Sequence, residues 1–232
     1  MIPTEKIKRE YMLPGAIVLA GIIVSIAIFA VRTDRTPALG HGDPALANPV
    51  SLSDHIIGNP QAPVKIIEYA DIDSEYSKQF QAALQQLMSE YAAGGQVAWV
   101  YRHFPLLDQH EDAGSHAEAA ECAALLGDAD AFWRFIDALQ AAAPGDNEFP
   151  REGYPGIAAQ LGLPSQAFDQ CLTSSRFTKK VYDDTKNAIA AGADGAPYTV
   201  ILVAGQKPVA ISGALAYSDL KKVVDDAIAK AR

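Results

Sequence analysis

The chain has 232 residues, of which 49% are hydrophobic and 20% are charged, and its formal net charge is −9. This composition is that of a folded domain and excludes a disordered tail. The acidic balance and the lack of a basic stripe exclude a nucleic-acid partner, because phosphate-binding surfaces need clustered Lys and Arg.

The N-terminal part predicts a membrane anchor. Residues 12–31 carry no charge, and about 20 apolar helical residues are enough to cross a bilayer. Basic residues lie on both sides of the run, so the positive-inside bias is slight. The short N-terminal segment is itself basic, and we therefore expect segment 1–11 to stay in the cytoplasm and the rest to lie outside, periplasmic or on the outer surface. The alternative is a cleavable secretory signal, but the small-x-small site Ala45-Leu46-Ala47 lies far beyond the apolar run. Both interpretations export the remainder of the chain.

Residues 32–50 are rich in Pro, Gly and Ala and have no hydrophobic period. This pattern predicts an extended linker between the membrane and a domain over residues 51–232. The domain is acidic, which disfavours binding to anionic lipid.

The centre of the domain is a strand that leads directly into a helix. Val64–Ala70 is rich in β-branched and aromatic residues, as in a strand buried on both faces. From Ser74 the period becomes helical, and the first helical turn presents Ser74 and Ser77. A strand feeding a helix places free N–H groups and positive dipole there, the usual position of a reactive thiolate or bound anion. Here that position holds two serines.

The remaining elements predict an α/β fold with a mixed sheet. Residues 96–101 form a second strand, parallel to the first through a right-handed βαβ crossover. A helical block follows, and the chain ends in an antiparallel hairpin and a closing helix. The segments expected are helices over residues 115–126, from residue 130, over 165–171 and over 174–191, strands over 198–203 and 209–212, and a helix over 218–231. The first of these helices opens with the capping-box pattern Ser115-His116-Ala117-Glu118, and Ile189 is expected to face inward from the helix over 174–191.

Three other kinds of site fit the sequence poorly. Asp71-Ile72-Asp73 follows a strand as in an aspartyl-nucleophile phosphatase, but no downstream lysine and acidic metal pair is evident. An EF-hand fails because its sixth position would be Tyr76 instead of Gly. His103, His110 and His116 lack metal-ligand spacing, so we expect satisfied or solvated histidines, no metal and no cofactor. The two acidic residues fit a helix-dipole partnership better.

Several short motifs in a fixed order resemble the DsbA-like branch of the thioredoxin superfamily, the membrane-tethered thiol-disulfide oxidoreductases. The resemblance covers nearly all of residues 51–232. The motifs are Gly58-Asn59-Pro60-Gln61-Ala62-Pro63-Val64, Glu68-Tyr69-Ala70-Asp71, Tyr101-Arg102-His103-Phe104-Pro105-Leu106, Ala119-Ala120-Glu121-Cys122-Ala123, Phe132-Trp133 and Gly195-Ala196-Pro197-Tyr198.

The resemblance implies a thioredoxin fold with an inserted helical domain, here about residues 107–192. Its chemistry uses Cys-x-x-Cys at the start of the first core helix, where this chain has Ser74-Glu75-Tyr76-Ser77. A serine hydroxyl is far less acidic than a thiol and cannot pass on a disulfide. Either the cysteines were lost naturally or both were replaced, and the sequence leaves the two open.

The resemblance also implies a peptide-binding loop. Pro197 corresponds to a cis-proline facing the active-site helix, and the residue before it, Ala196, would pair its backbone with an extended peptide. Glu75 and Tyr76 would line the same place. Glu68 corresponds to a buried acid that helps move protons in thiol-active relatives. For this chain we expect Glu68 to be an inherited or surface-reaching side chain.

Cys122 and Cys171 remain, in separate predicted helices. An even count in an exported domain favours a structural disulfide, with two buried reduced thiols as the alternative. Two functions follow as hypotheses. The first is a redox-inactive module that binds extended or unfolded polypeptide, or an envelope protein. The second is an oxidoreductase whose two cysteines have been replaced.

Overall fold

The computed structural model describes residues 42–128, 130–145 and 147–231. The predicted cytoplasmic segment 1–11, the predicted anchor 12–31 and most of the predicted linker lie outside these ranges. Within them, no helix combines the length and the apolar character needed to cross a bilayer.

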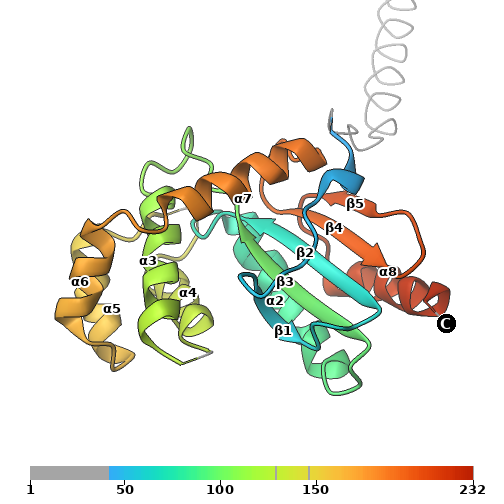
Figure 1. Ribbon diagram of the computed structural model, residues 1–232, viewed down its shortest axis with the longest axis horizontal. Coiled ribbons are helices and arrows are strands. Elements are labelled where there is room, and N and C mark those ends of the chain that lie inside the picture. Colours follow the sequence, from blue (N-terminus) through green and yellow to red (C-terminus); the bar gives the residue numbers. More distant parts are fainter. Residues whose placement is uncertain (1–41, 129, 146, 232) are drawn as a thin grey trace, which may run out of the picture. The chain divides into compact units, whose positions relative to one another are not determined.

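A five-stranded mixed sheet forms the centre of the domain (Figure 1). Its strand order is β1-β3-β2-β4-β5, with β2 parallel to β3 and the other neighbouring pairs antiparallel. The strands are β1 (His55–Gly58), β2 (Val64–Ala70), β3 (Val97–His103), β4 (Tyr198–Val203) and β5 (Val209–Ser212). The mixed sheet, the parallel pair and the hairpin are therefore confirmed. The edge strand β1 was not predicted.

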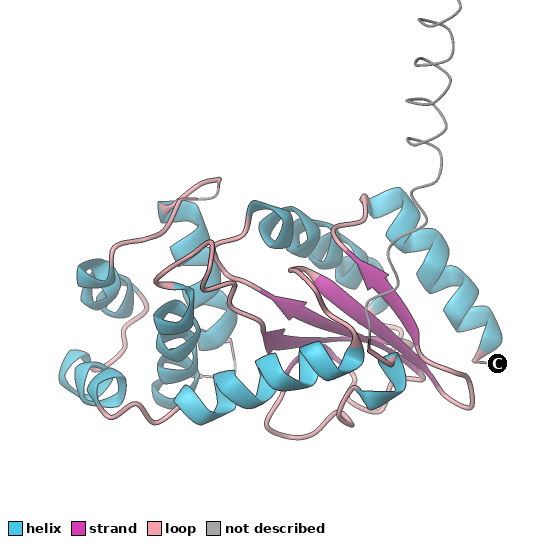
Figure 2. Cartoon of the chain, turned by 90° about the horizontal axis from the view of Figure 1, so that it is seen from above, coloured by secondary structure: helices cyan, strands magenta, loops and turns pink. Residues whose placement is uncertain are grey.

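Helices cover both faces of this sheet (Figure 2). They are α2 (Glu75–Tyr91), α3 (Ala113–Leu126), α4 (Ala131–Ala142), α5 (Tyr154–Gln160), α6 (Ser165–Thr173), α7 (Thr178–Ala191) and α8 (Tyr217–Lys230), with short 3-10 turns η1 (Pro44–Leu46) and η2 (Arg151–Gly153). Alternate residues of β2 face opposite sides. Ile66 packs in the core cluster that contains α2 and α8, and Ile67 in the one that contains α7.

Three helix details differ from the expectations. α7 begins at Thr178, because Ser175 has a left-handed φ of 50° that interrupts the helical turn before it. Ile189 was expected to face inward but is 58% exposed, since Ala188 and Ala191 supply the buried face. The predicted capping box at residue 115 is wrong, because α3 begins at Ala113.

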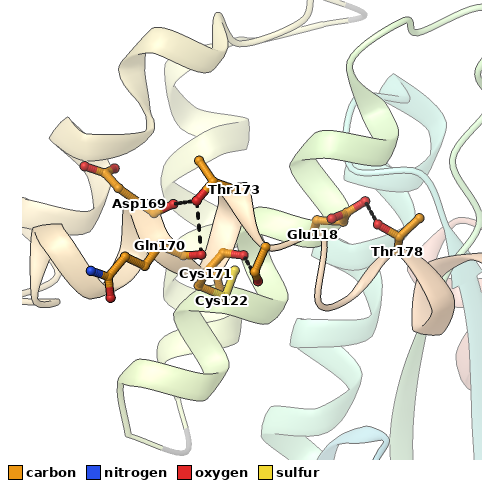
Figure 3. The surroundings of a disulfide bond; sticks show 8 residues. Glu118, Cys122, Asp169, Gln170, Cys171, Thr173 and Thr178 are labelled. Atoms are coloured by element: carbon orange, nitrogen blue, oxygen red, sulfur yellow. Dashed lines mark hydrogen bonds between the residues drawn. A yellow bond between two sulfur atoms is a disulfide. The ribbon is translucent and has the colours of Figure 1, made fainter.

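The inserted helices α3 to α6 lie beside the sheet and carry the disulfide (Figures 1 and 3). Cys122 on α3 is bonded to Cys171 on α6. The bond joins two buried positions that are 49 residues apart in sequence. The expectation of a structural disulfide is confirmed, and the bond links α3 to α6 within the insertion.

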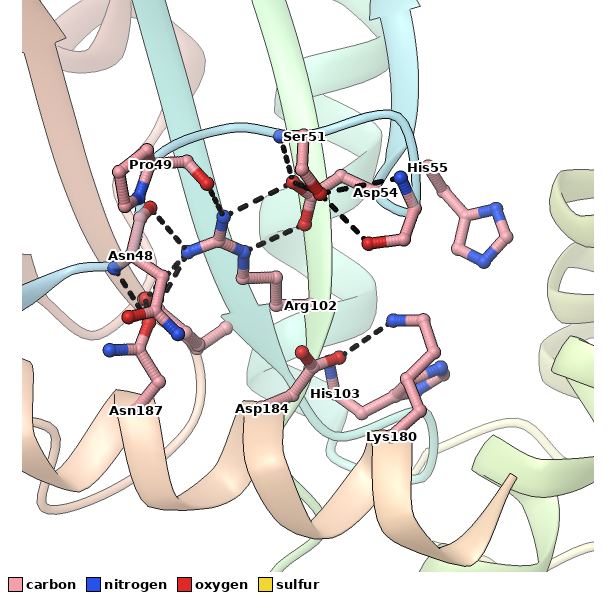
Figure 4. Close-up of polar contacts among 12 residues, drawn as sticks. Asn48, Pro49, Ser51, Asp54, His55, Arg102, His103, Lys180, Asp184 and Asn187 are labelled. Carbon is pink, nitrogen blue, oxygen red and sulfur yellow. Dashed lines mark hydrogen bonds and ion pairs between the residues drawn. The ribbon is translucent and has the colours of Figure 1, made fainter. Parts of the chain in front are cut away.

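Residues 43–50 pack onto the domain (Figure 4). The Arg102 guanidinium on β3 donates to the carbonyls of Asn48 at 3.0 Å and Pro49 at 3.2 Å, and pairs with Asp54 at 2.8 Å. Both charged side chains are almost fully buried. The extended tether expected up to residue 50 is therefore wrong for this stretch, and the folded domain begins before residue 51.

Candidate functional site

The two serines lie where the buried strand β2 gives way to α2. Ser74 is the N-cap of α2 but makes no capping bond with its side chain. Ser77, in the first turn, accepts the backbone N–H of Asp71 on its hydroxyl at 3.3 Å. Their side chains are enclosed, with residue exposures of 3% and 0%, whereas Tyr76 between them is 64% exposed. The first-turn N–H groups of a helix have no partners within the helix, and helix N-termini favour negatively charged groups for this reason.

The Ala196–Pro197 peptide bond is cis, as the resemblance implied. The next residue, Tyr198, opens β4 and pairs with Tyr69 near the end of β2. Because β2 and β4 are antiparallel, the proline lies at the same end of the sheet as the start of α2. Ala196 is half-buried, and within the described ranges its backbone N–H and C=O make no hydrogen bond. The backbone N–H and C=O of Ala196, which have no hydrogen-bond partner in the described part of the chain, thus lie at the same end of the sheet as the two serines.

The two aspartates before Ser74 are bound by neighbouring segments. Asp71 accepts the backbone N–H of Leu106 at 2.8 Å and contacts His110 Nδ1 at 2.8 Å. Asp73 contacts His116 Nδ1 at 2.7 Å. Both carboxylates are buried. Asp71 therefore holds the loop that precedes α3, and Asp73 holds a histidine of α3 itself, so both carboxylates have partners in addition to the expected helix dipole.

A second set of buried charges lies where side chains of β1, β3, α3 and α7 meet. Glu121 on α3 contacts His103 Nε2 at 3.0 Å, His55 Nε2 at 2.9 Å and Lys180 Nζ at 3.3 Å. His103, His110 and His116 each pair with a buried carboxylate, as expected of satisfied histidines, but His103 Nδ1 is buried and has no hydrogen-bond partner among the described residues. Among the described residues, no group of three or more His, Cys, Asp or Glu side chains is arranged to hold a metal ion.

Glu68 is fully buried in the middle of β2, so the expected surface-reaching side chain is wrong. Burial raises the pKa of Glu68 to about 8, although the hydrogen bond from Trp99 and the nearby polar Gln81 side chain act in the opposite direction. Trp99 Nε1 donates to one carboxyl oxygen at 2.9 Å. At neutral pH the carboxyl is therefore protonated. Gln81 lies one turn after Ser77 on the same side of α2, which places Glu68 behind the serines.

A loop of the helical insertion borders the site. We call residues 143–145 and 147–149 the site loop. Lys78, directly after Ser77, donates to the carbonyls of Ala143, at 2.9 Å, and Gly145. Gln140, near the end of α4, donates to Gln81 at 2.8 Å. The insertion is thus tied to the first two turns of α2.

Comparison with known proteins places this arrangement in a family. A family model described as Thioredoxin matches residues 51–226. The crystal structure of Pseudomonas aeruginosa DsbA2 is 26% identical, with a TM-score of 0.64, over 76% of this chain and 95% of that one. The chain belongs to the DsbA-like thioredoxin family. Oxidised BdbD from Bacillus subtilis has a TM-score of 0.66 over 82% of this chain and 98% of that one, but at 17% identity it shows the fold alone.

Curated relatives of this DsbA-like chain carry another name. The Na(+)/H(+) antiporter NhaA 1 of Salinispora arenicola is 33% identical over 144 residues, which are 62% of this chain and 21% of that protein. The antiporter NhaA 3 of Salinispora tropica is 34% identical over the same length and shares. The chain therefore spans about a fifth of the length of the curated relatives that it matches.

The structure brings Ser74, Ser77 and the cis-proline loop to one end of the sheet, as the family resemblance implied. The sequence did not indicate the partners of the two aspartates, because His110 and His116 lie 39 and 43 residues away. The only signal was chemical, namely two acids after a buried strand and two later histidines. Nothing in the sequence indicated that Lys78 donates hydrogen bonds to backbone carbonyls of the insertion.

Proposed function

We propose that this chain is an extracytoplasmic, membrane-anchored DsbA-like module that binds extended polypeptide in envelope protein folding and does not exchange disulfides. The observation that carries the proposal is the pair Ser74 and Ser77 at the start of α2. Disulfide exchange requires a thiolate that attacks or leaves sulfur, and the helix N-terminus serves to lower the pKa of that thiol. A hydroxyl at the same place remains protonated at neutral pH and forms no S–S bond.

Peptide binding is supported by what remains at the site. The unbonded backbone of Ala196, next to the cis bond, offers a donor and an acceptor to an extended chain, in the manner of strand addition. Tyr76, in the first turn of α2 between the two serines, is 64% exposed. Aromatic side chains supply large contact area at low entropic cost, so Tyr76 is the expected anchor for an apolar side chain of the peptide. Glu75, half-buried beside Tyr76, would contact the same peptide.

The membrane location is proposed on two grounds. Residues 12–31 have the length and composition of a spanning helix. The curated relatives are named as Na(+)/H(+) antiporters, which are membrane proteins. An envelope protein close to the membrane is therefore a reasonable partner for the exported domain.

A second candidate function is thiol-disulfide exchange by a parent protein whose two cysteines have been replaced by serine in this chain. Membership of the DsbA-like family favours it. The buried, protonated Glu68 also favours it, because a proton-holding acid behind the reactive turn has a use in thiol chemistry. The two candidates differ in whether the natural residues at 74 and 77 carry sulfur.

The binding proposal is tested with a permanently unfolded, thiol-free polypeptide, such as a fluorescently labelled, reduced and carboxymethylated protein. We expect saturable binding that weakens by about fivefold to tenfold in Tyr76→Ser. The matched control is Tyr182→Ser on α7, since Tyr182 is 62% exposed and lies outside the site. No saturable binding, or equal losses in the two variants, would contradict the proposal.

A further inference from the structure

His116 is a buried histidine with two acceptor partners. Its residue exposure is 0%, its Nδ1 lies 2.7 Å from Asp73 Oδ2, and its Nε2 lies 2.8 Å from the carbonyl oxygen of Phe149. A carbonyl oxygen can only accept, so Nε2 carries hydrogen. Because Nδ1 faces a carboxylate oxygen, it must donate as well. The ring is therefore an imidazolium in this arrangement.

The two partners of His116 belong to different parts of the molecule. Asp73 directly precedes Ser74, and Phe149 is the last residue of the site loop. Lys78, directly after Ser77, donates to the first residues of the same loop. The site loop is consequently fastened at both ends of the Ser74–Ser77 turn, once by a lysine and once by His116. A lysine stays charged through neutral pH, whereas a histidine is the side chain that changes charge in that range.

We propose that His116 is a pH-operated latch that holds the site loop against the peptide site. Charged, it joins Asp73 to Phe149. When it loses one proton, the remaining N–H stays with the carboxylate, which is the stronger acceptor. The other ring nitrogen then presents a lone pair to the Phe149 carbonyl, the contact becomes repulsive, and the site loop detaches. The effect on peptide affinity rests on the proposed function, whereas the release of the loop does not.

The surrounding charges set the direction of the switch. Burial lowers the pKa of His116. Three groups act against burial and together raise the pKa above 6.5: the Asp73 carboxylate through its hydrogen bond and charge, the Phe149 carbonyl, and the charge of Asp112 at the start of α3. From α5, Tyr154 lies with its ring 5.5 Å from the imidazole, and burial keeps this phenol neutral by raising its pKa. Arg151 pairs with Asp112, and the Glu148 carboxylate accepts the Asp112 backbone N–H. Release is therefore expected on the alkaline side of pH 6.5.

The test follows three quantities on the full chain across the neutral and alkaline range. These are the His116 Cε1–H chemical shift, hydrogen exchange of backbone amides in the site loop, and affinity for the labelled unfolded polypeptide. We expect exchange in residues 147–149 to accelerate with the midpoint at which His116 titrates. Affinity should fall by about tenfold or more over the same step, the scale of one lost hydrogen bond to a charged group.

Two variants separate the latch from general pH effects. His116→Gln should abolish the pH step in loop exchange. His55→Gln should keep the step, since it removes a histidine–carboxylate pair with Glu121 outside the site. If His116→Gln does not fold, the titration of the unmodified chain still decides the matter. Loop exchange that stays constant while His116 titrates, or a step that persists in His116→Gln, would overturn the proposal. A loop that opens without any peptide binding would instead refute the proposed function and leave the latch standing.

Discussion

Replacing Glu68 with Gln tests the buried acid behind the serines. The folded chain keeps the Glu68 proton up to about pH 8, whereas an ordinary glutamate loses it near pH 4.5. Between these values the folded state binds more protons than the unfolded state, so stability falls as pH rises. At about 1.4 kcal/mol per pH unit, the free energy of unfolding should fall by about 5 kcal/mol between pH 4.5 and about pH 8 through this group. Glu68→Gln keeps the shape but removes the titration.

The assay is urea unfolding of the protein and of Glu68→Gln at a series of pH values from 4.5 to 8. The variant should gain stability relative to the parent by about 5 kcal/mol across this window, because titrations elsewhere in the chain cancel in the difference. Trp99 can still donate to the amide oxygen, so the hydrogen bond at 2.9 Å survives. Parallel stability profiles for the two proteins would refute a protonated Glu68 and with it the buried placement of the carboxyl.

Three further predictions concern stability. Replacing both Cys122 and Cys171 with Ala should lower the free energy of unfolding by about 4 kcal/mol, from the loop entropy of a 49-residue separation, measured by urea unfolding. Arg102→Met should cost about 3 to 5 kcal/mol by leaving buried Asp54 unpaired, and limited proteolysis should then cut faster within residues 43–54. The histidine partners of Glu121 hold its pKa below the ordinary value against burial, so its stabilising effect is lost as pH falls below 4.5. In Glu121→Gln the free energy of unfolding should therefore decrease less steeply below pH 4.5 than in the unmodified chain.

The sequence predicted those elements whose pattern is strong and local. Three patterns are long enough to identify their elements. They are the apolar run of β2, the helical spacing of apolar residues in α2, and the two short strands β4 and β5 separated by a turn. Strand β1 has only four residues and depends on pairing with β3, so nothing local marks it. The cis bond before Pro197 came from the resemblance and not from any property of the residues around it.

The candidate site was predicted in position but not in its internal contacts. A residue type in an apolar strand does not reveal whether its carboxyl is buried or reaches water, and the expectation for Glu68 failed for that reason. The pairing of Asp73 with His116 joins segments 43 residues apart, beyond the reach of helix or strand periodicity. Such pairs are determined by how the helical insertion packs against the core.

The central claim is that a hydroxyl at positions 74 and 77 leaves a module that binds peptide without electron transfer. The most direct measurement is turnover of a dithiol peptide and reduction of insulin by the unmodified chain, beside Ser74→Cys combined with Ser77→Cys. We predict no turnover by the unmodified chain, and activity in the double variant if the rest of the family's machinery is intact. Catalytic turnover of thiols by the unmodified chain would contradict the account.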